Sequence, residues 1–215
     1  MIYIHHHLGL GDHIVCNGLV HHILKITEVN EPVFLAVKRH NYSSVKHLYE
    51  DTRVILDAVE NDKEAEGHYK DAETVFRLGF ENHRTSDWEK SFYDQLDLDY
   101  EKRFSEFSIK RNFANEKSLI EELNLPDKFA FCNFKGSTGD YACEADTDLL
   151  RVYLKPITAS VFDWIGVLEK ATEIHTIDSS IFHLIKQLNL NCRKVFYDVR
   201  HGTHENTFDD GWAIA

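Results

Sequence analysis

The feature that most constrains this chain is an alternation of short β-rich runs with helical stretches, which is typical of α/β proteins with a largely parallel sheet. Between the first two runs, the stretch 12–26 places Val15, Leu19 and Ile23 at helical spacing on one face, so we predict a helix there. A strand, a helix and a further strand in this order predict a βαβ unit. The β-rich runs of the first half are residues 2–4, 32–37, 53–56 and 74–78.

The same alternation starts again after Pro126, which indicates a second α/β half. We predict helices over 160–171 and 179–188 in this half. The segment 135–150 is too short and polar to be a convincing crossover helix. The β-rich runs of this half are residues 129–134, 151–154, 173–177 and 194–197.

The stretch 87–123 between the halves has helical character, and we place the boundary between about residues 105 and 125, where no Gly/Ser-rich linker marks it. We therefore predict two small Rossmann-like domains, residues 1–112 and 113–215.

Composition and charge limit the class of protein. Hydrophobic residues make up 43% of the 215 residues and charged residues 28%, so the chain can bury a core. The net charge of −12 disfavours a nucleic-acid partner, because phosphate backbones bind clustered Lys and Arg. The sequence has no run of roughly 20 apolar residues and no signal peptide at its start, so we expect a cytoplasmic protein. Peripheral contact with a membrane stays open.

The first candidate site is the segment Leu8-Gly9-Leu10-Gly11-Asp12, which follows the first predicted strand. The chain passes there from a strand to a helix at the carboxyl edge of the sheet, where open α/β folds bind ligands. Gly9 and Gly11 permit a sharp turn and close approach of a ligand. Asp12 has three interpretations: a helix N-cap, a favourable charge at the helix start, or a carboxylate that accepts a proton from a hydroxyl.

The same segment begins like the dinucleotide fingerprint G-x-G-x-x-G, but Ile14 occupies the sixth position. The second strand is followed by Arg39 where an NAD site places an acid. Asp12 would also repel a pyrophosphate at this helix start. An NADP-type Rossmann oxidoreductase, with Arg39 reading the 2′-phosphate, is the least favoured of our alternatives.

The second candidate site is Asp178-Ser179-Ser180-Ile181-Phe182-His183, where a strand ends in an acid and two hydroxyls and becomes a helix. Ser179 and Ser180 can place hydroxyls and free backbone amides around a phosphate. His183 lies about one turn further and can face the same pocket. The alternative interpretation is a simple helix cap, since Asp and Ser are preferred there.

A third candidate follows the strand 129–134. Its sequence is Lys135-Gly136-Ser137-Thr138-Gly139-Asp140, which offers a cation, two hydroxyls and two flexible residues as a phosphate cradle. It does not match the Walker A pattern. The alternative is a polar surface turn.

Histidines are numerous, but their spacing argues against a metal site. His5 and His7 lie on one side of an extended chain and His6 on the other, so the three cannot chelate one ion together. No H-E-x-x-H pattern occurs, and we expect neither a structural nor a catalytic metal. The cysteines are too scattered for a disulfide framework or a zinc site, and we expect reduced thiols at Cys16, Cys132, Cys143 and Cys192.

A resemblance to the GT-B glycosyltransferases rests on two segments, Leu8-Gly9-Leu10-Gly11-Asp12 and Asp178-Ser179-Ser180-Ile181-Phe182-His183-Leu184. The heptosyltransferase-like group of that family, which acts on lipopolysaccharide and other surface glycans, carries Gly-Asp at the first strand-to-helix turn. It also carries Asp-[Ser/Thr]-[Gly/Ser]-x-x-His-Leu in its second domain. The resemblance implies two Rossmann-like domains facing across a cleft, and a place in surface polysaccharide biosynthesis.

The resemblance also implies roles. The family's catalytic base maps onto Asp12, on the acceptor side, where a glycan or lipid-linked acceptor binds. The family's binding site for the nucleotide-sugar donor maps onto Asp178, Ser179 and Ser180, with His183 nearby. No other cofactor is implied. Lys135 matches by position the basic residue that steadies the diphosphate. Transfer is then expected to invert the anomeric centre without a metal.

The chain departs from the family in length, because ordinary members are much longer. The segment 200–215 has no apolar helix, and we expect a flexible surface tail there, although His201 and His204 could border the donor pocket. A non-catalytic nucleotide- or glycan-binding protein of the same fold is therefore our main alternative.

Overall fold

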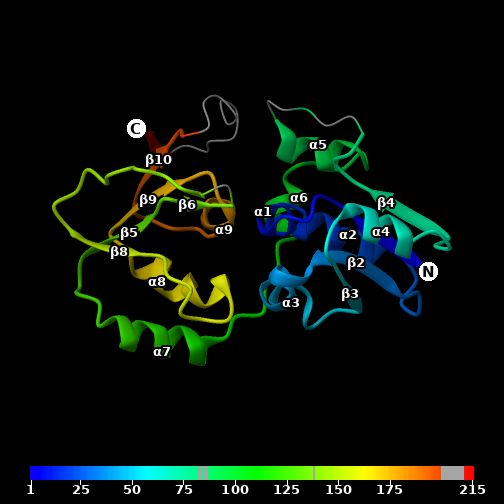
Figure 1. Ribbon diagram of the computed structural model, residues 1–215, viewed down its shortest axis with the longest axis horizontal. Coiled ribbons are helices and arrows are strands. Elements are labelled where there is room, and N and C mark those ends of the chain that lie inside the picture. The colour runs from blue at the N-terminus through cyan, green and yellow to red at the C-terminus, as the bar shows by residue number, and fades with distance from the viewer. Residues whose placement is uncertain (82–83, 85–86, 138, 200–210) are drawn as a thin grey trace. The chain divides into compact units, whose positions relative to one another are not determined.

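The computed structural model describes residues 1–81, 84, 87–137, 139–199 and 211–215 (Figure 1). The chain divides into two compact units, residues 1–110 and 111–215. The division lies close to the boundary expected after residue 112. Each unit is built around one sheet whose paired strands are all parallel, so the predicted α/β class is confirmed.

The sheet of unit 1 has four strands in the order β3-β2-β1-β4. From β1 the chain first builds outward through β2 and β3, and β4 then returns to the other side of β1. The order therefore reverses between β1 and β4, which is the topological switch point where such sheets bind ligands. The strands are β1 Ile2–His5, β2 Val33–Lys38, β3 Val54–Val59 and β4 Thr74–Arg77.

Two helices of unit 1 were not predicted from the sequence, α3 and α4. The helix α4 buries only Ala65 and lies in an acidic stretch, so it has almost no apolar periodicity to detect. The helix α3 buries Val45, Leu48 and Tyr49. The helical elements of this unit are α1 Leu10–Val15, α2 Asn17–Ile26, η1 Arg39–Asn41, α3 Tyr42–Tyr49, α4 Asp62–His68, α5 Trp88–Asp94 and α6 Lys102–Ser105.

The single helix predicted over 12–26 is wrong, because α1 and α2 are separated at Cys16. The buried Asn17 side chain fixes the start of α2: its amide donates to the Leu48 carbonyl and accepts from the Ser108 N–H at 2.8 Å. A Cβ at Gly18 would lie 2.3 Å from the Lys102 carbonyl oxygen. We attribute the break to these long-range contacts, which a reading of helical periodicity does not include.

The sheet of unit 2 has five strands in the order β11-β10-β9-β5-β8. From β5 the chain goes first to β8 on one side and then to β9, β10 and β11 on the other. The switch point of this sheet is therefore between β5 and β9. The strands are β5 Phe129–Asn133, β8 Leu150–Tyr153, β9 Glu173–Ile177, β10 Arg193–Tyr197 and β11 Trp212–Ile214.

Aromatic packing fixes the core of unit 2. Trp164 lies against Phe131 of β5, with ring centroids 6.0 Å apart, and Phe182 lies 4.9 Å from Phe196 of β10. Trp212 packs on Phe182 at 5.3 Å, which explains how β11 extends the sheet where we expected only a tail. Residues 200–210 of that tail, with His201 and His204, lie outside the described residues. The helical elements are α7 Phe113–Leu123, η2 Val161–Trp164, α8 Ile165–Lys170 and α9 Ser180–Gln187.

The connection from β5 to β8 contains no helix in its described residues, as the polar sequence predicted. It begins with a hairpin, β6 Lys135–Gly136 and β7 Gly139–Asp140, and continues as a coil over 141–149. We call residues 141–149 the crossover coil. It occupies the sheet face where a crossover helix would normally pack, and its Ala145 side chain is buried there.

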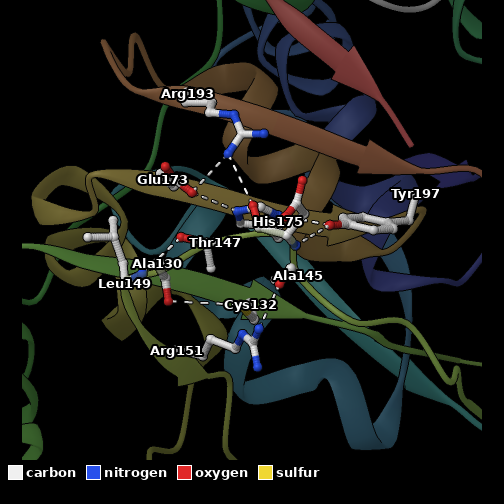
Figure 2. Close-up of polar contacts among 11 residues, drawn as sticks. Ala130, Cys132, Ala145, Thr147, Leu149, Arg151, Glu173, His175, Arg193 and Tyr197 are labelled. Carbon is white, nitrogen blue, oxygen red and sulfur yellow. Dashed lines mark hydrogen bonds and ion pairs between the residues drawn. The ribbon is translucent and has the colours of Figure 1, made fainter.

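Side chains from three strands hold the crossover coil (Figure 2). The Arg151 guanidinium donates to the Ala145 carbonyl at 2.9 Å, and Arg193 donates to the Asp146 carbonyl at 3.3 Å. The buried His175 ring links Glu173 and Tyr197, each at 3.0 Å. The Glu173 carboxylate accepts from Nε2, and Nδ1 shares a hydrogen bond with the Tyr197 hydroxyl. A polar network therefore takes the place of a helix.

Candidate functional site

The switch point of unit 1 contains the first candidate segment. Gly9, not Asp12, is the N-cap of α1, and Asp12 is the third residue of the helix. The capping interpretation of Asp12 is therefore wrong, and the favourable position of a carboxylate in a first helical turn applies instead. Asp12 is partly buried.

Gly9 is required here by space rather than by its backbone angles. Its φ of −71° is open to any residue, but a Cβ at this position would lie 2.5 Å from Oδ2 of Asp12. The carboxylate therefore lies directly over the glycine that begins the helix. Any side chain at residue 9 would displace Asp12, so the Gly-x-x-Asp spacing has a physical reason. Gly11 lies between them in the first turn.

A hydrogen bond links the ends of β1 and β4 at this edge of the sheet. Nε2 of His7, just beyond β1, donates to the Gly79 carbonyl just beyond β4, at 2.9 Å. Gly79 has φ +82°, and a Cβ there would overlap the Phe92 ring. Both His7 and Gly79 were missed from the sequence. A glycine two residues after a strand was the signal available for Gly79.

Two buried histidines lie beside Asp12. The rings of His6 and His13 meet edge to face, with centroids 4.4 Å apart, and neither side chain is exposed. Burial lowers the pKa of His6 to about 4 and the pKa of His13 well below its usual value. Both rings are therefore neutral near pH 7 and add no positive charge to this segment.

The strand alternation predicted for the three histidines is confirmed. His5 and His7 both contact Phe80, at 4.7 and 5.1 Å between ring centroids, whereas His6 turns to His13. Within the described part of the chain, no three His, Cys, Asp or Glu side chains form a group that could hold a metal ion.

The switch point of unit 2 contains the second candidate segment. Ser179 is the N-cap of α9, as the cap interpretation predicted, and its hydroxyl oxygen accepts from the Phe182 N–H at 3.4 Å. Asn133, the last residue of β5, donates through Nδ2 to the same oxygen at 3.0 Å and to the Lys135 carbonyl at 3.2 Å. Asn133 thus joins the ends of β5 and β9.

This arrangement fixes the role of the Ser179 hydroxyl. A hydroxyl has two acceptor lone pairs and one hydrogen, and here the Asn133 amide and the Phe182 N–H occupy the lone pairs. The hydrogen is left to donate. Ser179 therefore offers a hydroxyl donor beside the first amides of α9, a combination suited to an anion. Asn133, which is buried, was missed from the sequence, and a buried amide at a strand end was the available signal.

Asp178 and His183 contact each other across the first turn of α9. His183 Nε2 lies 3.4 Å from Asp178 Oδ1, and the side chains are 4% and 13% exposed, respectively. The strand-end carboxylate therefore orients the imidazole. Ser180 is the first residue of the helix and is partly buried.

The third candidate segment is a β-hairpin rather than a loop that curls around a phosphate. Lys135 Nζ lies 3.4 Å from Asp140 Oδ1, and both side chains are largely exposed. Ser137 is exposed at the turn, and Thr138 lies outside the described residues. Asn133 thus links the backbone carbonyl of Lys135, not its side chain, to Ser179. Ser137 makes no hydrogen bond or ion pair with that cluster among the described residues.

Comparison with known proteins supports the architecture. A solved structure shares this fold. It is the glycosyl transferase family 9 protein from Veillonella parvula DSM 2008, with a TM-score of 0.62 over 100% of this chain and 86% of that chain, at 9% sequence identity. The sequence matches no family model and no curated protein. At this identity the likeness shows the fold, and the chemistry must be argued from the residues.

No described helix has the length and apolar character needed to span a membrane.

Proposed function

We propose that this chain is a metal-independent glycosyltransferase that moves a sugar from a nucleotide-sugar to a hydroxyl of a glycan or lipid-linked acceptor. One observation carries the proposal: the two candidate segments lie at the switch points of their own sheets, in a fold shared with a family 9 glycosyl transferase. Switch points are where open α/β sheets bind ligands.

Asp12 is the proposed catalytic base. Its carboxylate takes the proton of the acceptor hydroxyl as that oxygen attacks the anomeric carbon of the donor sugar. The bond from the anomeric carbon to the diphosphate breaks on the opposite face, so the configuration inverts. Gly9 leaves room for the carboxylate itself, and Gly11 lets the acceptor approach beside it. The neutral His6 and His13 place no cation there to weaken it as a base.

The edge of the unit 2 sheet is the proposed binding site of the nucleoside diphosphate. Its Ser179 hydroxyl and the first amides of α9 donate to the phosphate oxygens, which gain negative charge as the sugar leaves. Lys135 and His183 supply further donors, with Asp178 orienting His183. The remaining predicted contacts to the donor are Ser137, Thr138 and Ser180.

A non-catalytic nucleotide- or glycan-binding protein is the second candidate, and one observation favours it. The Asp12 carboxylate lies over Gly9 at the start of its own helix, a position that also fits a structural role. The oxidoreductase alternative is not favoured, because Arg39 is held by Glu60 at 2.6 Å and Glu64 at 3.1 Å.

A thermal-shift screen with UDP, GDP, ADP, CMP and dTDP identifies the nucleotide, because a ligand that binds only the folded state raises the melting temperature. Transfer and donor hydrolysis are then measured with sugars carried on that nucleotide. Transfer supports the enzyme, and binding without transfer or hydrolysis supports the non-catalytic protein. Absence of any nucleotide shift contradicts both.

A further inference from the structure

A pocket lies on one face of the unit 1 sheet, toward the amino ends of the strands. It has a volume of about 240 Å3 and is lined by Tyr3, Phe34, Ile55, Asp57 and His68, among others. Gly9 and Asp12 follow the carboxyl end of β1, so this pocket is not part of the candidate site described above.

The floor of the pocket is an apolar row across three strands. Tyr3, Phe34 and Ile55 are register partners on β1, β2 and β3 and therefore project from the same face. The Tyr3 and Phe34 rings are nearly parallel, at 7°, with centroids 6.4 Å apart. Ile55 is 45% exposed, so the short helix α4 leaves this end of the row uncovered.

A polar cluster stands beside the row. Asp57, two residues beyond Ile55, projects from the same face, and its Oδ2 accepts from the Tyr3 hydroxyl and from Nδ1 of His68, the latter at 2.7 Å. Its register partner Ala36 has only a methyl group, which lets the Tyr3 hydroxyl reach across. Burial and the Asp57 carboxylate raise the pKa of Tyr3, so the phenol stays protonated and donates.

The cluster leaves two polar atoms for a ligand. Both hydrogen bonds of Asp57 end on Oδ2, and Oδ1 has no partner among the described residues. His68 uses Nδ1 for its contact with Asp57, so its Nε2 is left for a ligand hydroxyl, which can either donate or accept. Two polar atoms on separate side chains, next to an apolar floor, match adjacent hydroxyls and the C–H face of one sugar ring. The volume is below the roughly 300–1,000 Å3 of ordinary ligand pockets, which suits a single ring rather than a nucleotide.

We infer that the pocket formed by Tyr3, Phe34, Ile55, Asp57 and His68 binds a single neutral sugar ring, with two adjacent hydroxyls on Asp57 Oδ1 and His68 Nε2. The inference stands apart from the proposed function, because it uses none of the residues placed in the transfer site.

Saturation-transfer difference NMR on the full chain tests the inference, with the methyl glycosides of glucose, galactose, mannose and N-acetylglucosamine as probes. At least one glycoside is expected to bind. Asp57→Asn should weaken that binding about tenfold, since hydrogen bonds to a charged group are the stronger ones. Asp71→Asn is the matched control, because Asp71 is an exposed carboxylate outside the pocket, and it should leave binding unchanged.

Two further variants keep the test decisive. His68→Gln, at a half-exposed helix end, should weaken binding even if Asp57→Asn fails to fold. Asp12→Asn should bind the glycoside as the wild type does, which separates this pocket from an acceptor bound at the transfer site. The inference is overturned if none of the glycosides binds. It is also overturned if binding survives both pocket variants.

Discussion

The two switch points share a topology and differ in chemistry. At the edge of unit 1 the chain places a carboxylate, Asp12, over a glycine and beside two buried neutral imidazoles. At the edge of unit 2 it places hydrogen-bond donors, with Asn133 orienting the Ser179 hydroxyl outward. One edge suits the removal of a proton, and the other suits an anion. The same βαβ geometry therefore carries either a carboxylate or hydrogen-bond donors, depending on a few residues after each strand.

The largest expected effect separates the two edges directly. Asp12→Asn removes the proposed base, so transfer should fall by about 10²–10⁴-fold, the usual contribution of a general base. Binding of the nucleoside diphosphate should not change, because its proposed donors are all in unit 2. Initial rates and calorimetric titration measure the two quantities, with Asp71→Asn as the control. Transfer at the wild-type rate removes Asp12 from the mechanism.

Acid should destabilise the edge of unit 1. The pKa of His6 is about 4 in the folded chain against 6.5 unfolded, so the unfolded state takes up the proton first as the pH falls. Stability is fully present above pH 6.5 and is lost between about 6.5 and 4. His6 alone accounts for about 2 kcal/mol at pH 5. Hydrogen exchange of β1 and α1 at pH 7.5 and pH 5 measures this loss.

His13→Leu provides the control for the acid effect. Neither ring nitrogen of the buried His13 has a partner among the described residues, so an apolar side chain should keep or raise stability at pH 7.5. The loss on acidification should be smaller than in the wild type. An unchanged loss would show that His13 does not contribute to it.

The edge of unit 2 should respond to Ser179→Ala in two ways. Loss of the cap should reduce the free energy of unfolding by about 1 kcal/mol. Loss of the hydroxyl donor should also weaken nucleoside diphosphate binding about tenfold. Ser160→Ala is the matched control, because Ser160 caps η2 in the same way, accepting from Phe162 N–H at 3.2 Å. Equal binding losses in both variants would reduce Ser179 to a cap.

The smallest expected effect concerns the crossovers. Arg193→Met removes one hydrogen bond to the crossover coil. It should lower the free energy of unfolding by less than about 1 kcal/mol, because Arg193 is half exposed. Exchange should accelerate over 141–149 and stay unchanged in α3, which connects β2 to β3 in unit 1. Faster exchange in both segments would indicate a global effect instead.

The sequence predicted the strands well because each is a short, strongly β-forming run. The strand over 173–177 was placed at its observed bounds. Features that depend on distant partners were missed: the break at Cys16 depends on Leu48, Ser108 and Lys102. The strand β11 depends on Trp212 finding Phe182, and three residues carry no periodicity by themselves.

At the candidate site, local sequence identified the glycine, the carboxylate and the serines, since each follows a strand directly. It did not identify the residues that orient them. Asn133 reaches Ser179 from another strand, and His7 reaches Gly79 across the sheet. The cap interpretation of Asp12 was wrong because the N-cap is Gly9, three residues earlier than the preferred cap types suggested.

Hydrogen exchange with the nucleoside diphosphate that gives the largest thermal shift tests the central claim most directly. We predict that binding slows exchange at 133–137 and 178–183, the edge of unit 2. Ser179→Ala should diminish this protection, and Asp12→Asn should preserve it. Protection concentrated at 9–12 and unaffected by Ser179→Ala would contradict the assignment of donor and base to their respective edges.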